Sequence, residues 1–344
     1  MNSLFTIILS NNPNLFFLKL VVILGIILAC IVLFKITALP LSQSSSLNQV
    51  EGFTQKEPFV LKRGQDAFDE FYTEVYDELY DVPLRSQNEL VQVLKNTEPS
   101  TKESVFLDVG SGTGYVVNQL VDAGYEAYGI DKSQAMIDFS EQKYPEAEYK
   151  CGDVVDSMAF DTGKFTHILC TNFTFYLIKD QRTFLQNCYF WLKPNAYLIL
   201  HLVDYDKFNI YSPNAKAPLA NFPTLSKPNR VTDTMAQFYD YRYNASYRFP
   251  TLPTVPTLSR EGQGIKEVLY NETFTDNETK HVRQNEYSLY MDTIDSTLEM
   301  ASKIGFIVKG KMNMAKVQKS KNVNQIANPY ADENQYLYIL ERPM

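Results

Sequence analysis

The spacing of hydrophobic positions changes along the chain and predicts its elements. Between Phe68 and Tyr80, apolar residues recur at positions i, i+3, i+4 and i+7, the pattern of one face of an amphipathic helix. A second helix is predicted from about Arg85 to Leu94. Val105–Asp108 is then a short, almost wholly apolar run of the length of a buried strand.

From this strand onward, predicted strands and helices alternate. Gly124 ends the first helix of the series, Ser133 is suited to cap the second, and Asp180 begins the third, which Pro194 ends. This alternation is typical of a parallel sheet with helices on both faces. The strands are predicted at 105–108, 126–131, 149–151, 165–170 and 196–203.

Residues 204–285 interrupt this alternation. They are rich in Pro, Tyr and Asn, and stretches such as 237–249 alternate between apolar and polar residues, which predicts an inserted, mostly antiparallel lobe. A helix near 293–303 and strands at 306–312 and 336–340 complete the main series. The predicted fold class is therefore α/β: a doubly wound, seven-stranded, mostly parallel sheet with an inserted antiparallel β lobe.

The N-terminal region has a different pattern. Residues 20–34 are apolar and uncharged, and between Leu15 and Leu39 only Lys19 and Lys35 interrupt the apolar character. A transmembrane helix needs roughly 20 such residues, so one is predicted at about 15–39. A secretory signal peptide would need basic residues before the apolar run and a small-residue cleavage site after it, and neither is evident.

This assignment divides the chain into three parts: an N-terminal segment over 1–39, a flexible tether over 40–65, and a main domain over 66–344 that includes the lobe at 204–285. More basic residues follow the apolar run than precede it, which predicts a membrane-bound protein with its main domain on the cytoplasmic side. Asn-X-Ser/Thr sequons would permit the opposite orientation; they begin at Asn172, Asn244, Asn271 and Asn277.

Composition and charge narrow the classes of function. Aromatic residues make up 13% and hydrophobic residues 45% of the chain, as expected for a folded domain with a sizeable core. The formal net charge is −8, and residues 1–50 contain two lysines and no acidic residue, so the remainder is more acidic still. Nucleic acid is therefore not an expected partner, since binding phosphates needs a basic surface.

The cysteines and histidines predict no metal site. The chain has four cysteines, without a Cys-X-X-Cys pair, and three histidines. We expect free, buried thiols rather than disulfides or zinc ligands. Nothing in the sequence specifies an oligomeric state.

Glycine and aspartate residues gather where the first three predicted strands end. Gly110, Gly112 and Gly114 follow the first strand, Asp131 ends the second, and Asp153 follows the third. In doubly wound sheets, ligands bind beyond the carboxyl ends of the strands. Glycines let the backbone approach a ligand, and a carboxylate can accept both hydroxyl hydrogens of a ribose.

These motifs, Leu107–Gly114, Gly129–Ser133 with Met136, and Gly152–Val154, resemble those of class I methyltransferases that use S-adenosylmethionine (SAM). The resemblance extends over about residues 68–342 and implies SAM as cofactor. It implies that the methionine part binds at the loop, the ribose at the second strand, the adenine at the third, and the sulfonium near the fourth. The implied cofactor-binding residues are Asp108, Gly110, Ser111, Gly112, Gly114, Asp131, Lys132, Met136, Asp153, Val154, Asn172 and Phe173.

A nicotinamide-binding domain is the main alternative, because it shares the sheet and the ribose carboxylate. Its loop has the pattern Gly-X-Gly-X-X-Gly, whereas here the third glycine comes one residue early and Tyr115 holds the sixth position. Asp108, just before the loop, would also repel a pyrophosphate and favours a cationic ligand.

The residues that carry out the transfer are less well defined. His201 in the fifth strand is a weak candidate for a general base, and a buried structural histidine is the alternative. Tyr76, in a Tyr-Asp pair that resembles the pair covering the cofactor in small-molecule methyltransferases, is the other weak candidate.

The predicted function is methyl transfer from SAM to a small molecule by in-line displacement. A membrane-lipid acceptor and an inactive, membrane-tethered binding protein are the alternatives. The inserted lobe is rich in aromatic residues, which suits a flat or apolar acceptor or a methylammonium product, or simply forms the lobe's own sheet. These aromatic residues are Phe238, Tyr239, Tyr241, Tyr243, Tyr247 and Phe249.

Overall fold

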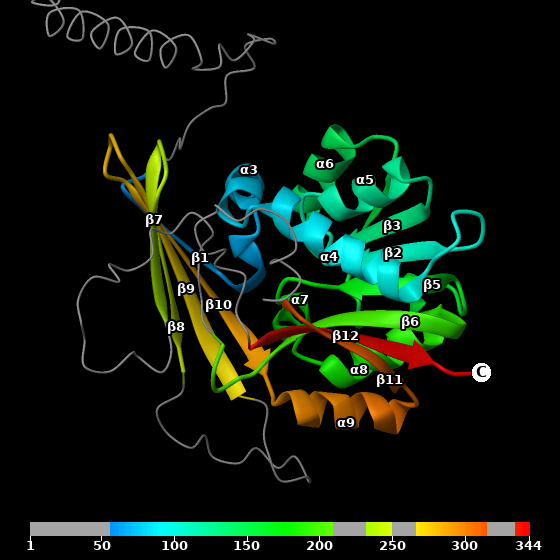
Figure 1. Ribbon diagram of the computed structural model, residues 1–344. Coiled ribbons are helices and arrows are strands. Elements are labelled where there is room, and N and C mark those ends of the chain that lie inside the picture. Colours follow the sequence, from blue (N-terminus) through cyan, green and yellow to red (C-terminus); the bar gives the residue numbers. More distant parts are fainter. Residues whose placement is uncertain (1–55, 209–231, 250–265, 315–333) are drawn as a thin grey trace, which may run out of the picture. The chain divides into compact units, whose positions relative to one another are not determined.

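The computed structural model describes residues 56–208, 232–249, 266–314 and 334–344. The chain divides into two units, Met1–Thr54 and Gln55–Met344, and all the described residues belong to the second. Within that unit the described strands form a sheet of seven strands and a sheet of five (Figure 1).

The seven-stranded sheet has the order β11-β12-β6-β5-β2-β3-β4. Its strands run parallel except β12, which is antiparallel to both β6 and β11. This confirms the predicted doubly wound α/β fold. The strand order reverses at β2, between β3 and β5, where such sheets bind ligands. The strands are β2 (Val105–Val109), β3 (Glu126–Asp131), β4 (Glu148–Cys151), β5 (Phe165–Cys170), β6 (Leu192–Val203), β11 (Ile307–Asn313) and β12 (Gln335–Arg342).

The core of this sheet comes from its continuous apolar runs. All of β2 is buried, and Phe106, Leu169 and Ile199 from three neighbouring strands belong to one cluster. Val117 and Leu120 of α5 (Tyr115–Asp122) belong to the same cluster. Burying such a side chain contributes about 1.5–3 kcal/mol to stability. A strand covered on both faces buries side chains on both, so its sequence is a nearly continuous apolar run.

Helices cover both faces of this sheet: α4, α5 and α6 lie on one face, and α8 and α9 on the other (Figure 1). Ser133 caps α6 as predicted, and Asp180, predicted to begin a helix, caps α8; their side chains accept the backbone N–H groups of Met136 and Thr183. The helices not yet bounded are α3 (Glu70–Leu79), α4 (Val82–Thr97), α6 (Gln134–Lys143), α7 (Thr174–Leu177), α8 (Gln181–Trp191) and α9 (Ile294–Ile304).

The five-stranded sheet has the order β1-β10-β9-β8-β7. Strands β7 to β10 are antiparallel, as predicted for the inserted lobe. The lobe extends to Met291, beyond the predicted limit of 285, because β10 pairs with β9 along its whole length. The strands are β7 (Asp233–Gln237), β8 (Tyr241–Arg248), β9 (Lys266–Asp276) and β10 (Val282–Met291).

The predicted tether over 40–65 needs a correction. Residues Phe59–Arg63 form β1, which pairs in parallel with β10, and a 3₁₀ helix, η2 (Gly64–Ala67), follows directly. A strand this short at a sheet edge is stabilised by its partner, and its partner lies more than 200 residues away in the sequence. Local spacing therefore carries no sign of it.

Two boundaries differ from the predictions because of proline. Pro83 lies in the first turn of α4, where its missing N–H is not needed, so the helix begins before the predicted Arg85. Pro194 does not end α8, which stops at Trp191, but lies within β6. It falls in the irregular stretch between the Leu192 and Tyr197 pairings with β5, where a missing N–H is tolerated.

The cysteines agree in part with the prediction of free, buried thiols. Cys170 and Cys188 are buried free thiols, whereas Cys151 is exposed, because the edge strand β4 is covered less than the central strands.

Among the described residues, no helix is long and apolar enough to cross a membrane. The predicted spanning helix at 15–39 and most of the tether lie outside these residues.

Candidate active site

The turn between β2 and α5 is built from glycines in left-handed conformations. Gly110, Gly112 and Gly114 have φ angles of 66°, 52° and 80°. A Cβ on Gly110 would lie 2.5 Å from Thr174 Cγ2, and one on Gly114 would lie 2.6 Å from the Tyr149 hydroxyl oxygen. Both conformation and space therefore select glycine, and the backbone of the loop is free to approach a ligand.

Asp131 ends β3 and holds the glycine loop through its carboxylate. Its Oδ2 accepts the Gly112 N–H at 2.9 Å, and its Oδ1 accepts the Ser133 N–H at 2.9 Å. Burial raises the pKa of Asp131, and these backbone hydrogen bonds oppose the rise. Each carboxylate oxygen can accept a further hydrogen bond, so Asp131 can bind the two hydroxyls of a ribose.

Asp108 is buried at the end of β2 among other carboxylates. Burial, with the negative charges of Glu89 and Asp131, raises its pKa to about 8, while the positive charge of Arg85 opposes the rise. A cation near this cluster would favour the ionised form of Asp108. The donor set therefore suits a positively charged ligand, such as a sulfonium or an amino group, and not a pyrophosphate.

Lys132 and Asp153 form an ion pair at 2.8 Å between the ends of β3 and β4. Burial acts to raise the pKa of Asp153, but the hydrogen bonds from Lys132 and the Val155 backbone outweigh it, so the pKa is lowered. Both groups are partly exposed, and the pair contributes little to stability. Their position agrees better with a role toward a ligand than with a role in the core.

A cavity of about 730 Å³ lies over the carboxyl ends of β2, β3 and β4. Phe173 does not line it but lines an adjoining cavity. Asp108, Ser111 and Gly114 line neither, and lie behind or beneath the loop. The predicted cofactor-binding residues that line the large cavity are Gly110, Gly112, Asp131, Lys132, Met136, Asp153, Val154 and Asn172.

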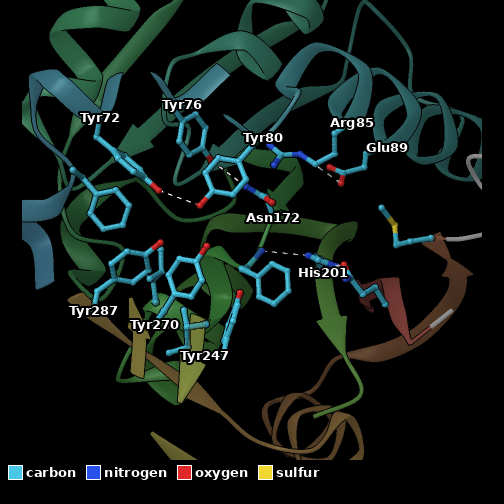
Figure 2. Close-up of a pocket in the computed structure, with 16 residues that line it drawn as sticks. Tyr72, Tyr76, Tyr80, Arg85, Glu89, Asn172, His201, Tyr247, Tyr270 and Tyr287 are labelled. Atoms are coloured by element: carbon cyan, nitrogen blue, oxygen red, sulfur yellow. Dashed lines mark hydrogen bonds and ion pairs between the residues drawn. The ribbon is translucent and has the colours of Figure 1, made fainter. Parts of the chain in front are cut away.

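The adjoining cavity, of about 90 Å³, lies between the two sheets and is rich in tyrosine (Figure 2). It shares Tyr76 and Asn172 with the large cavity. The Tyr76 hydroxyl accepts a hydrogen bond from Asn172 Nδ2 at 3.0 Å, and burial raises the pKa of Tyr76. Asn172 and Phe173 both have positive φ, of 46° and 64°, which is unusual for residues other than glycine, and both line the small cavity.

Helix α3 is fixed over the glycine loop by Asp77. Its carboxylate accepts hydrogen bonds from the Thr113 hydroxyl in the loop and from Lys143 in α6. The two residues of the predicted Tyr76–Asp77 pair therefore make different contacts. Tyr76 lines both cavities, whereas Asp77 holds the helix in place.

His201 lies beside the small cavity, and both of its ring nitrogens have partners. Nδ1 accepts the Phe173 backbone N–H at 3.3 Å, so Nε2 carries the proton, 3.1 Å from Gln335 Oε1. Burial and the positive charge of Arg85 lower the pKa of His201 to about 4, although the bond to Gln335 opposes this. These contacts favour the structural alternative over a general base.

Several residues of the small cavity were not singled out from the sequence. Arg85 and Glu89 are buried and lie one helical turn apart in α4, with 4.0 Å between Arg85 Nε and Glu89 Oε1. A pair of opposite charges on the apolar face of a helix is the signal that could have drawn attention to them. Of the six aromatic residues noted in the lobe, Tyr247 lines the cavity, whereas Tyr239 is 96% exposed.

A family model described as a methyltransferase domain matches residues 107–200, which run from the glycine loop to β6. The chain carries a SAM-dependent methyltransferase domain. A stretch of 48 residues is 46% identical to the biotin biosynthesis bifunctional protein BioHC of Cellvibrio japonicus (strain Ueda107). That stretch is 14% of this chain and 10% of the relative.

Solved methyltransferase structures share the fold of this domain at low sequence identity. The CcbJ methyltransferase from Streptomyces caelestis has a TM-score of 0.56 and 13% identity, over 80% of this chain and 98% of that one. A SAM-dependent methyltransferase from Clostridium acetobutylicum ATCC 824 has a TM-score of 0.53 and 14% identity, over 80% and 97%. The sugar N-methyltransferase KedS8 from Streptoalloteichus sp ATCC 53650 has a TM-score of 0.50 and 16% identity, over 78% and 93%.

SAM, the cofactor of this domain, fits the residues described above. The ligand is a cation, and the carboxylates of Asp108, Glu89 and Asp131 lie close enough together for their negative charges to interact. The glycine loop leaves backbone close to the large cavity, and Asp131 faces it. The role of each individual residue stays a prediction, based on the resemblance to class I methyltransferases.

Proposed function

We propose that this methyltransferase domain transfers a methyl group from SAM to a small-molecule acceptor. The pair of adjoining cavities, which share Tyr76 and Asn172, carries the proposal. A transfer between two substrates needs both held side by side in a fixed orientation. The smaller cavity, of about 90 Å³, has room for a small chemical group and not for a folded polymer.

In this proposal the large cavity holds SAM. Asp131 would bind the ribose hydroxyls, Asp153 and Val154 the adenine, and the glycine loop the methionine part. Arg85 lines the adjoining small cavity, and its positive charge would suit the carboxylate of the methionine part. When bound, SAM supplies an electrophilic methyl group on a sulfonium.

The protein's own contribution would be alignment and exclusion of water. Tyr76 and Asn172 lie where the cavities meet and would keep the reacting groups in line. Because the Nδ1 lone pair of His201 already accepts the Phe173 N–H and its Nε2 lies against Gln335, no described histidine of the small cavity is suited to act as a base. A nucleophile that needs no base until after transfer fits this site best.

Two observations bear on the class of acceptor. KedS8, whose fold this chain shares, is a sugar N-methyltransferase, which supports a small-molecule acceptor. The apolar N-terminal run favours a second candidate, a lipid at a membrane surface, because tethering raises the local concentration of membrane substrates.

Radiolabelled SAM separates these candidates. The full chain is incubated with labelled SAM and either a water-soluble metabolite extract or vesicles made from a lipid extract, with a Gly110→Val variant as the blank. We expect label in a small, water-soluble product. Label in the vesicle lipids would replace the small-molecule acceptor by a lipid, and label in neither would contradict the proposal.

We further propose that residues 15–39 anchor the chain in a membrane, with the methyltransferase domain on the cytoplasmic side. The uncharged run over 20–34 and the excess of basic residues after it support this. Two of the sequon asparagines, Asn172 and Asn271, lie at a cavity and in the interior, where a glycan has no room.

Fractionation of cells expressing the full chain tests the anchor. Carbonate-washed membranes should retain the natural chain and lose a Leu24→Arg, Leu28→Arg variant, because charges in the apolar run oppose insertion. A Leu41→Arg variant, outside the run, is the matched control. A natural chain that stays soluble would overturn the proposal.

A further inference from the structure

A buried carboxylate lies behind the tyrosine-rich wall of the small cavity. Glu272, in β9, is 0% exposed. Its Oε1 accepts hydrogen bonds from the hydroxyls of Tyr72 and Tyr80, at 3.0 Å each, and of Tyr243, at 2.8 Å. These hydroxyls come from α3, its C-cap and β8, so three elements converge on one oxygen atom.

The hydroxyl network continues around the cavity. Tyr243 and Tyr270 have hydroxyl oxygens 2.9 Å apart, and Tyr72 and Tyr80 have theirs 3.1 Å apart. Tyr287 also hydrogen bonds to Tyr72. Figure 2 shows the hydroxyls of Tyr72, Tyr80, Tyr270 and Tyr287 gathered at one side of the cavity.

The directions of the hydroxyl protons give this wall its polarity. Each tyrosine has one hydroxyl proton, and those of Tyr72, Tyr80 and Tyr243 are directed at Glu272. Tyr270 and Tyr287 in turn direct their protons at Tyr243 and Tyr72, so the lone pairs of Tyr270 and Tyr287 are the groups available to a ligand. Because Tyr72, Tyr80, Tyr270 and Tyr287 line the cavity, that side of it offers hydrogen-bond acceptors and the faces of aromatic rings.

The negative charge of Glu272 has no ion-pair partner among the described residues. Its Oε2 lies 3.5 Å from Asn285 Nδ2. Asn285 Oδ1 in turn accepts a hydrogen bond from Arg283 Nε, and the charge of Arg283 is paired with Asp69 at 2.8 Å. Burial raises the pKa of Glu272, and its four hydrogen-bond donors oppose the rise. A buried carboxylate is costly unless its charge is compensated, and a cation bound against the tyrosine hydroxyls would offset that charge.

We infer that this tyrosine–Glu272 wall binds the amino group of the acceptor, so that the enzyme is an N-methyltransferase for a small amine. Lone pairs, ring faces and an unpaired carboxylate all attract an ammonium or a methylated ammonium. The inference rests on the proposed function, because it names the acceptor class for the same site.

The chemistry of N-methylation uses this charge. The neutral amine attacks the methyl carbon with its lone pair, an N–C bond forms, and the S–C bond breaks with its electron pair left on sulfur. The positive charge thus passes from the sulfonium to the nitrogen, and the product ammonium loses its proton afterwards. Glu272 and the tyrosine rings would stabilise the charge that develops on nitrogen in the transition state.

Choline and its neutral isostere 3,3-dimethylbutan-1-ol test the inference, since they share a shape and differ in charge. Their affinities for the full chain are measured by ligand-observed NMR in the presence of saturating S-adenosylhomocysteine. We expect choline to bind about tenfold more tightly than the isostere. Glu272→Gln should reduce this preference to less than about twofold, because the amide keeps the shape and removes the charge.

Two further variants guard against a merely structural effect. Glu267→Gln removes an exposed carboxylate from the same strand and should keep the full preference. Tyr270→Phe keeps Glu272 and the ring, removes one hydroxyl, and should lower the preference about two- to threefold. If Glu272→Gln fails to fold, Tyr270→Phe tests the inference in its place, and an unchanged preference for choline in Tyr270→Phe would then overturn the inference.

The outcomes separate this inference from the proposed function. Binding of S-adenosylhomocysteine without a preference for choline would overturn the amine acceptor and leave a SAM-dependent enzyme for another acceptor. A preference that persists in Glu272→Gln would also overturn it. Failure to bind S-adenosylhomocysteine by calorimetry would instead contradict the proposed function itself.

Discussion

The two sheets of this protein build their halves of the site in opposite ways. In the seven-stranded sheet the contacts are short-range: Gly112 and Asp131, which hydrogen bond to each other, are 19 residues apart. In the five-stranded sheet they are long-range: Tyr72 and its acceptor Glu272 are 200 residues apart. The first half can be recognised from motifs, and the second exists only once the lobe has packed against α3.

The chemistry differs as well. The cofactor half presents backbone, a glycine loop and carboxylates such as Asp131 that line an open cavity. The small cavity presents tyrosine rings and hydroxyls before a carboxylate that is 0% exposed. Both halves contain negatively charged carboxylates, which suits a reaction that passes a positive charge from one substrate to the other.

The largest expected effect is on the cofactor half alone. Asp131→Ala removes both acceptors of the ribose hydroxyls and should weaken SAM binding at least about 100-fold, since hydrogen bonds to a charged group contribute about 1.5–3 kcal/mol each. Calorimetry measures the affinity. Asp138→Ala, an exposed carboxylate of α6, is the control. Equal SAM affinity in Asp131→Ala and the natural chain would remove Asp131 from the site.

The glycine loop should be sensitive to a single methyl group. Gly114→Ala combines a φ of 80° with a Cβ 2.6 Å from the Tyr149 hydroxyl oxygen, and should lower the free energy of unfolding by about 2–4 kcal/mol. Gly163→Ala is matched, because Gly163 has a φ of 64° and open space around it. It should cost about 1 kcal/mol. Equal losses in urea unfolding would mean that conformation, and not the close approach, selects glycine at position 114.

The pH dependence of SAM binding should follow Asp108, whose pKa is raised to about 8 by burial and by neighbouring carboxylates. In the unfolded chain this pKa is about 3.9, so the folded state holds the proton more tightly, and the free energy of unfolding falls as the pH rises between these values. A cation favours the ionised form, so SAM affinity should rise about fivefold from pH 6.5 to 8 and level off above about pH 9.

Asp108→Asn isolates this effect from the titration of SAM itself. Its calorimetric affinities at the same pH values should lack the rise that the natural chain shows. If the two pH profiles run parallel, Asp108 does not sense the cofactor.

The smallest effect is expected at the border of the two halves. His201 is neutral above a pKa of about 4, where burial and the charge of Arg85 hold it. His201→Gln should therefore lower kcat by less than about tenfold and leave the pH profile of kcat/KM unchanged between pH 5 and 7, because a histidine base contributes about 100-fold or more. Loss of an inflection near pH 6.5 in the variant would restore His201 as the base.

The same division explains what the sequence could predict. The strands from Val105 to Val203 were recognisable because buried parallel strands are continuous apolar runs, and residues at their carboxyl ends must face a ligand. Ser133 and Asp180 carry local capping signals that need no partner far away. The fold and most of the cofactor cavity follow from such local rules.

The acceptor side could not be predicted in this way. Strand β1 lay inside a predicted tether because its partner is β10, far along the chain. Tyr72 and Tyr80 read as the face of a helix, and Glu272 as one polar position in an alternating strand. Their proposed common role depends on their meeting at one buried point, and spacing along the sequence does not show that they meet.

The most direct test measures two affinities, for S-adenosylhomocysteine and for choline, in Asp131→Ala and Glu272→Gln. A crossed pattern is predicted: Asp131→Ala loses the first affinity and, at concentrations that still fill the site, keeps the second, while Glu272→Gln keeps the first and loses the second. If both variants lose both ligands without a fall in Tm, or if neither loses either, the account of one cavity for the methyl donor and one for an amine is contradicted.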